Sequence, residues 1–281
     1  MAVVARFPSI LVSLALLMSA LAAQAAEPVL KVEIGNASRS FTRSQLLADP
    51  DLTTIDVPHD NAYGGPMRYR ALPLEHLLAG LDLPRDQILE SVAGDGFIGL
   101  LPVDLVLHPK ADAAHAYLAI EPPDAPWPIL PGGKLTAGPF YIVWLNPAAS
   151  GVRGEQWPYQ VVTIRNTDSP AKRWPQLAVD PALPADDPVR AGQALFVGEC
   201  LACHKMNGAG SAALGPDLNL PFNPTEYFKL DALKRYIRNP AALRHWANMQ
   251  MKGFSEASLS DHEIDLIVDY LAYMAGRKVL P

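Results

Sequence analysis

The only two cysteines of the chain stand in the segment Cys200-Leu201-Ala202-Cys203-His204. Thiols at this spacing lie about one helical turn apart, so both can bond to the vinyl groups of a single haem. The next residue, His204, can then direct an imidazole nitrogen at the iron. Cys-x-x-Cys-His is the attachment signature of c-type haem. The segment therefore predicts one covalently bound haem with His204 as an axial iron ligand.

The cysteine pair has three alternative functions: a disulfide, a thioredoxin-like redox pair or half of a zinc site. A thioredoxin motif is expected at a strand-to-helix junction within a βαβ unit, whereas Cys200 follows a predicted helix in a helical region. A zinc site needs four ligands, and the surrounding sequence offers too few at close spacing. The residues favour haem.

A second axial ligand is sought among the methionines, because a thioether is a soft ligand that raises the reduction potential of haem iron. Met206 is too close to the cysteine motif to reach the opposite haem face, and Met274 lies in a predicted helix as ordinary core. Met249 and Met251 remain, with His245 or an open position as alternatives.

The elements that position these groups are predicted to be helices. The predicted helices are Val189–Glu199, Asp231–Asn239 and Ser260–Gly276. Pro240 stops the second helix. The third has a capping box formed by Ser260 and Glu263, and its apolar stripe faces one side. Residues 188–281 are therefore expected to form an all-α domain.

The first part of the chain has a different pattern. Apolar alternation or β-rich composition predicts strands at Val29–Ile34, Phe140–Leu145 and Val161–Ile164. Short helices are predicted from Thr42 to Ala48, with Gln45 as a capping-box partner, and from Leu74 to Leu81. Strands and helices without a regular βαβ repeat indicate an α+β domain at residues 26–166.

Residues 167–187 carry four prolines and four acidic residues with few apolar neighbours, which is typical of a semi-extended linker. Such a linker leaves two domains separable unless they share an apolar interface. Residues 1–25 have the pattern of a signal peptide: Arg6, an apolar run from Ile10 to Leu21, and Ala23-Gln24-Ala25 before the expected cut. An uncleaved anchor is the alternative, although the run is shorter than the ~20 residues of a spanning helix.

These features predict a protein exported to a bacterial periplasm, with no transmembrane segment in its mature chain. A length of 281 residues, of which 49% are hydrophobic and 19% charged, suits about two folded domains. The net charge of −6 argues against nucleic acid as the main partner. Residues 26–165 hold 10 basic and 16 acidic side chains, whereas residues 188–281 hold 10 and 9. The excess of acidic side chains therefore lies in the first domain.

Residues 188–281 resemble a class I cytochrome c domain along nearly their whole length. The resemblance rests on the run Arg190 to Phe196 followed by the cysteine motif, and on Gly215-Pro216-Asp217-Leu218 after it. It implies a cytochrome c fold in which the Pro216 carbonyl accepts a hydrogen bond from His204 and fixes its ring. It also implies that Gly192 lets the last helix approach the first, with Phe196 and Tyr270 packed beside it.

The same resemblance selects among the methionines. The family commonly has Met-Pro-x-Phe before its last helix, and Met251-Lys252-Gly253-Phe254 fits that register. Met251 is therefore the expected axial ligand opposite His204. Lys252 departs from the usual proline, which loosens the loop.

Residues 29–165 resemble, more weakly, the sulfite-oxidase-type molybdopterin-binding fold. The resembling segments are Tyr69 to Leu78, Ala93 to Phe97, Phe140 to Trp144 and Gln156 to Ile164. Enzymes of that type bind molybdenum through a cysteine thiolate, and this region has no cysteine. No molybdenum cofactor is expected, and the domain is interpreted as a cofactor-free docking module.

Other metal ligands in this region are scattered. His59, His76, His108, His115 and Met67 could bind copper or zinc, but none forms a close pair in the sequence. The predicted function is a periplasmic electron carrier between two redox proteins, with no catalytic residues. The alternative is an enzyme or enzyme subunit whose N-terminal domain binds a substrate or second metal and passes electrons to the haem.

Overall fold

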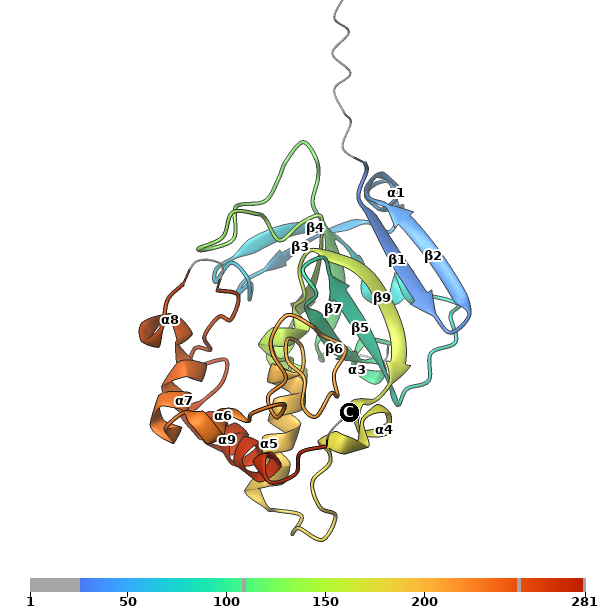
Figure 1. Ribbon diagram of the computed structural model, residues 1–281. Coiled ribbons are helices and arrows are strands. Elements are labelled where there is room, and N and C mark those ends of the chain that lie inside the picture. Colours follow the sequence, from blue (N-terminus) through green and yellow to red (C-terminus); the bar gives the residue numbers. More distant parts are fainter. Residues whose placement is uncertain (1–25, 108–109, 247–248, 280–281) are drawn as a thin grey trace, which may run out of the picture.

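The structure is a computed structural model that describes residues 26–107, 110–246 and 249–279 (Figure 1). The predicted signal peptide and His108 lie outside the described residues. The strands are β1 (Val29–Ile34), β2 (Ala37–Thr42), β3 (Thr53–Val57), β4 (Met67–Pro73), β5 (Gln87–Ala93), β6 (Ile98–Pro102), β7 (His115–Ile120), β8 (Phe140–Leu145) and β9 (Val161–Asp168). The α-helices are α1 (Arg43–Leu47), α2 (Leu74–Leu78), α3 (Val103–Leu107), α4 (Pro170–Arg173), α5 (Pro188–Leu195), α6 (Pro224–Tyr227), α7 (Leu230–Arg238), α8 (Pro240–Leu243) and α9 (Asp261–Ala275). Tighter or wider turns form η1 (Pro147–Ser150), η2 (Gly154–Gln156), η3 (Pro175–Leu177) and the π-helix η4 (Phe196–Cys200).

The N-terminal part consists of two sheets that share one hydrophobic core. Within the described residues, the first sheet has the strand order β2-β1-β9-β5-β6, in which β1 and β9 are parallel and the other neighbours antiparallel. The second sheet, β3-β4-β7-β8, is antiparallel throughout. Tyr69, Tyr141 and Trp144 are among its largest fully buried side chains. A sheet-rich part with short helices agrees with the predicted α+β class.

Local sequence explains the first elements. Leu30, Val32 and Ile34 of β1 are buried while the residues between them are exposed, as the alternation predicts. The predicted capping box at α1 is confirmed: Thr42 Oγ1 accepts the Gln45 N–H at 3.2 Å, and the Gln45 side chain accepts the Thr42 N–H at 2.8 Å. Strong local signals set these bounds.

Two predicted bounds differ from the structure. The helix expected from Leu74 to Leu81 ends at Leu78, because Ala79 is extended and Gly80 has a φ of +72°. The strand expected at Val161–Ile164 continues to Asp168, because β9 pairs with β1 on one edge and with β5 along its whole length on the other. Long-range pairing extends it beyond its own apolar run.

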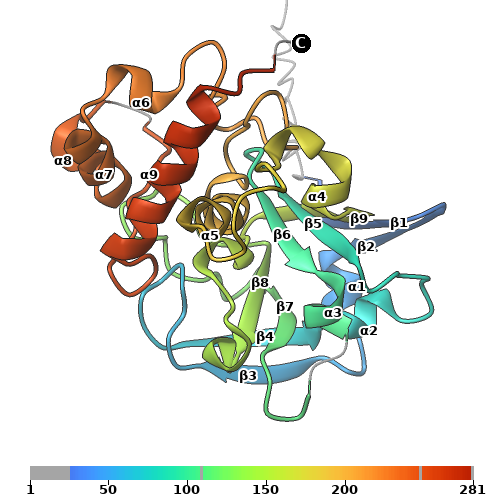
Figure 2. The same cartoon turned by 90° about the horizontal axis from the view of Figure 1, so that it is seen from below.

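The C-terminal part is helical and surrounds a second hydrophobic cluster. Its predicted helices are confirmed as α5 with η4, α7 and α9, and the Ser260–Glu263 capping box of α9 is present. Figure 2 shows α9 beside α5. They approach at Gly192, where a Cβ atom would lie 2.0 Å from the Leu266 carbonyl oxygen. A residue without a side chain is required there.

Residues 167–187, expected to be a linker, are folded onto the rest of the molecule. Leu177 and Val179 are buried in the second cluster. The Tyr270 hydroxyl donates to the Leu177 carbonyl at 2.8 Å, and the Tyr273 hydroxyl accepts the Asp180 N–H at 2.9 Å. The segment therefore belongs to the packing of the C-terminal part.

The two parts also touch directly. The Ile98 N–H at the start of β6 donates to the Ala202 carbonyl, inside the cysteine motif, at 3.0 Å. Leu100 of the same strand packs against the second hydrophobic cluster. An apolar contact and a backbone hydrogen bond therefore join the first sheet to the motif.

A buried carboxylate adds a polar contact. The Glu90 side chain of β5 is 1% exposed and pairs with Arg165 and Arg173, both at 2.8 Å. The Ser211 hydroxyl, from the loop after the cysteine motif, donates to the same carboxylate. Glu90 thus links the first sheet to α4 and to the C-terminal part through satisfied hydrogen bonds, as a buried charge requires.

Candidate haem-attachment site

The cysteine motif continues directly from the first helix of the C-terminal part. Helix α5 begins after Asp187, whose carboxylate accepts the Val189 N–H at 2.9 Å, and η4 carries the chain on to Cys200. Phe196 is buried at their junction, with its ring centroid 5.3 Å from that of Tyr270 on α9. This contact fixes the start of the motif.

The motif closes one tight turn. The N–H groups of Cys203 and His204 both donate to the Cys200 carbonyl, at 3.1 and 2.9 Å. Both cysteines are free thiols. The backbone therefore places two thiols on one turn, followed immediately by an imidazole.

Burial controls the chemistry of the thiols. It raises the pKa of Cys203 to about 12 and that of Cys200 further, and the charges of Glu155 and Glu199 add to the effect at Cys200. Thiol–disulfide exchange needs an accessible thiolate, which a lowered pKa provides. These thiols are protonated at neutral pH, so the environment is unsuited to a thioredoxin-like pair.

The His204 ring is held by the loop that follows the motif. Its Nδ1 lies 2.9 Å from the Pro216 carbonyl oxygen, which leaves Nε2 for another bond. Burial lowers the His204 pKa, so the ring is neutral, as a metal ligand must be. A Cβ atom on Gly215 would lie 2.5 Å from Cε1 of the ring. Only glycine lets the loop pass this close.

Asp217 organises the same loop. Its carboxylate accepts backbone N–H groups from Asn207 at 3.2 Å, Gly208 at 2.6 Å, Asn219 at 2.8 Å and Leu220 at 2.9 Å. The loop carrying Pro216 is thereby tied to the segment just after His204. In the sequence, the position of Asp217 directly after Pro216 was the signal that it could organise this loop.

Three buried asparagines connect this loop to α9. Asn219 Nδ2 donates to Asn207 Oδ1 and to the Met274 carbonyl, each at 2.8 Å. Asn223 Nδ2 donates to Asn219 Oδ1 and to the Leu271 carbonyl, each at 2.9 Å. This asparagine ladder ties the loop to carbonyl groups in the last two turns of α9.

The four methionines of the C-terminal part differ in how far they are buried. Met206 and Met274 lie in the second hydrophobic cluster, each 1% exposed or less. Met249 and Met251 are half-buried in the segment between α8 and α9. That segment is fixed by Arg238, whose guanidinium donates to the carbonyls of Phe254 and Leu259, each at 2.7 Å. His245 is exposed.

A charged cluster from both parts of the chain stands next to Cys200. Arg153, between η1 and η2, binds Glu199 of η4 and, at 3.0 Å, Glu263 of α9. The Glu199 side chain is 1% exposed, so its charge depends on this arginine. The pairs are separated by 46 and 110 residues in the sequence, and nothing in the sequence indicated them.

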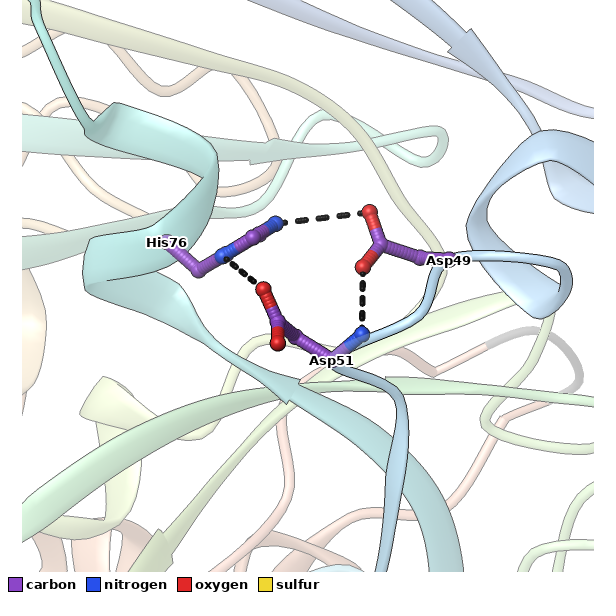
Figure 3. Close-up of side chains that lie close together, drawn as sticks. All are labelled: Asp49, Asp51 and His76. Carbon is purple, nitrogen blue, oxygen red and sulfur yellow. Dashed lines mark hydrogen bonds and ion pairs between the residues drawn. The ribbon is translucent and has the colours of Figure 1, made fainter.

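The structure also brings His76 next to Asp49 and Asp51, which lie about 25 positions earlier in the sequence (Figure 3). Nε2 of His76 on α2 lies 3.3 Å from Asp49, and its Nδ1 lies 3.2 Å from Asp51. Among the described residues, this is the one group of His, Cys, Asp or Glu close enough to share a metal ion, and His59 and His115 are not part of it. Both ring nitrogens face carboxylates, so the group joins α2 to the loop after α1.

The residues around the cysteine motif fit a covalent haem. Two thiols share a turn, and a neutral imidazole has one nitrogen bonded to Pro216 and the other available.

In the described part of the chain no helix is both long and apolar enough to cross a membrane.

Comparison with known proteins gives an independent result. Residues 189–275 match the family model of cytochrome c. A comparison of the chain with curated proteins gave no match. The family match begins at the second residue of α5 and ends with α9, and so covers the cysteine motif, the Pro216 loop and the methionine segment. The C-terminal region of this chain is therefore a cytochrome c domain, a haem-binding domain for electron transfer.

Proposed function

We propose that the protein is an exported, periplasmic cytochrome with one covalent haem, which carries single electrons between a donor and an acceptor protein. The observation that carries this proposal is the turn of Cys200, Cys203 and His204, with His204 fixed by Pro216 at 2.9 Å. When bound, the haem supplies an iron that gains and loses one electron.

The chain's own groups would hold that haem as follows. Cys200 and Cys203 would form the two thioether bonds, and His204 Nε2 would be one ligand of the iron. Met251 would be the other iron ligand, with Met249 as its competitor. The hydrogen bond from Arg238 to the Phe254 carbonyl supports this assignment, because Met251 lies three residues before Phe254 and a ligand loop must be held in place.

The N-terminal part is proposed to be a docking module related to sulfite-oxidase-type domains without their metal-binding cysteine. Both cysteines of the chain belong to the haem motif, which supports the lack of a molybdenum cofactor. The acidic excess of residues 26–165 supports a role in orienting a charged redox protein, because charge steers encounter and register.

The haem assignment is tested by replacing both cysteines with alanine. C200A/C203A should lose all haem that survives denaturing gel electrophoresis, because no thioether can form. The exposed His245 offers a matched control, and H245A should keep its covalent haem. Covalent haem in the double variant would refute the assignment.

The alternative function is an enzyme or enzyme subunit with a second metal or substrate in the N-terminal part. The observation in favour of this alternative is the cluster of His76, Asp49 and Asp51 (Figure 3), whose side chains lie close enough together to share a metal ion. Elemental analysis of the purified, full-length protein separates the two functions. One iron per chain without molybdenum, copper or zinc supports the carrier, whereas a stoichiometric second metal supports the alternative.

A further inference from the structure

The segment that carries Met251 reaches across to the N-terminal part. The Lys252 ammonium donates to the Tyr159 hydroxyl at 3.2 Å and lies 5.5 Å from the centroid of the Tyr159 ring. These two distances place the ammonium beyond the hydroxyl edge of the ring, so the contact is a charge-assisted hydrogen bond. The residue next to the proposed ligand is therefore held by a group 93 positions earlier in the chain.

Tyr159 is a firm support for this contact. It forms a backbone bridge with Tyr141 of β8, and the two rings meet edge to face with centroids 6.4 Å apart. Tyr141 is completely buried. The Tyr159 ring is therefore anchored on the second sheet, and a side chain bound to it is fixed relative to the whole N-terminal core.

A second N-terminal group acts on the same lysine. Glu155 lies close enough for its carboxyl pKa, raised to about 8 by burial and by Glu199, to be lowered in part by the Lys252 charge. Lys252 thus has two neighbours from the N-terminal part. Arg238, which binds the Phe254 carbonyl, holds the other end of the same short segment within the C-terminal part.

The backbone at position 252 needs such a support. A proline there would fix its own φ, whereas lysine leaves φ free. We propose that Tyr159 and Lys252 are positioning residues through which the N-terminal part holds the Met251 segment closed over the haem iron. This inference rests on the proposed function, since it takes Met251 as an iron ligand.

The test uses the full-length, haem-loaded, oxidised protein and imidazole as an outside ligand. Imidazole replaces the methionine when the iron–sulfur bond breaks and an iron–nitrogen bond forms, so its affinity reports how firmly the segment is closed. Binding is followed by loss of the weak long-wavelength sulfur-to-iron band. Met251→Ala, which should lack this band from the start, checks the proposed function separately.

Lys252→Leu and Tyr159→Leu should each bind imidazole about two- to fivefold more tightly than the unaltered protein, the range that one hydrogen bond at a partly exposed site supports. The double variant should bind no more tightly than the Lys252 variant alone, because the contact with Tyr159 is already lost in that variant. Lys134→Met changes the net charge equally on an exposed loop and should bind as the unaltered protein does.

Equal imidazole affinity in all these variants would overturn the inference while leaving Met251 as the ligand. Additive effects of the two substitutions would also overturn it, because the residues would then act independently. If Met251→Ala keeps the band, the ligand assignment fails instead, and the two failures are distinguishable.

Discussion

Glu155 shows how one carboxyl group depends on both parts of the chain. It stands on η2 in the N-terminal part, and burial, reinforced by the negative charge of Glu199, raises its pKa from the usual 4.5 to about 8. Between these two values the group is protonated in the folded chain and ionised in the unfolded chain. Folding therefore binds a proton in this range.

The stability of the protein should consequently depend on pH through this residue. Its contribution to the free energy of unfolding falls as the pH rises from about 4.5 to about 8, and is constant above that. Glu155→Gln should remove this fall. Guanidinium unfolding of the haem-loaded protein at several pH values measures it, with the exposed Glu33→Gln as control. A variant whose pH profile matches that of the unaltered protein would contradict the prediction.

At the scale of elements, the contact between α5 and α9 depends on Gly192. Ala at this position places a Cβ atom 2.0 Å from the Leu266 oxygen and 2.9 Å from the Tyr270 Cβ, so the helices must separate. Gly192→Ala should lower the free energy of unfolding by about 1–3 kcal/mol, the usual cost of overpacking. Thermal unfolding followed by circular dichroism measures this loss.

Gly198, one turn and a half further along in η4, is the matched control. Apart from its chain neighbours and the backbone of its own helix, no heavy atom lies within 4 Å of a Cβ atom built at Gly198. Gly198→Ala should therefore be neutral or slightly stabilising, because alanine favours helix by about 1 kcal/mol relative to glycine. Equal melting temperatures for both variants would show that the close approach is not the cause.

Elements with strong local signals were predictable, and those built by distant pairing were not. The capping boxes at Thr42 and Ser260 predicted α1 and α9, because each box consists of hydrogen bonds between residues only three positions apart. Strand β4, by contrast, pairs with β7 through residues far apart in the chain, such as Ala71 and Ala119. The same holds at the site: the cysteine motif is local, whereas Arg153 reaches Glu199 from 46 positions away.

At the scale of the whole molecule, the two domains that the sequence predicts to be separable share an interface. Leu100 packs on the second cluster, the Ile98 N–H binds the cysteine motif, and Leu177 and Val179 complete the C-terminal core. The condition under which a proline-rich linker leaves its domains independent is thus not met.

A fragment that begins at residue 188 should therefore be less stable than one that begins at residue 174. The longer fragment keeps Leu177 and Val179, which are 2% and 6% exposed in the intact protein. Removing two such side chains should cost about 3–5 kcal/mol. Guanidinium unfolding of the two haem-loaded fragments, followed by haem absorption, tests this. Identical midpoints would mean that the segment contributes nothing to the C-terminal core.

The asparagine ladder and the Asp217 carboxylate have a consequence for the speed of electron exchange. An electron moves readily only if the groups around it need little rearrangement when the charge on the iron changes. Here the loop beside His204 has its amides already bonded, to Asp217 on one side and to α9 carbonyls on the other. Dipoles fixed in advance do not reorient during the reaction. We therefore expect these fixed hydrogen bonds to keep the reorganisation energy of the site low before any redox partner binds.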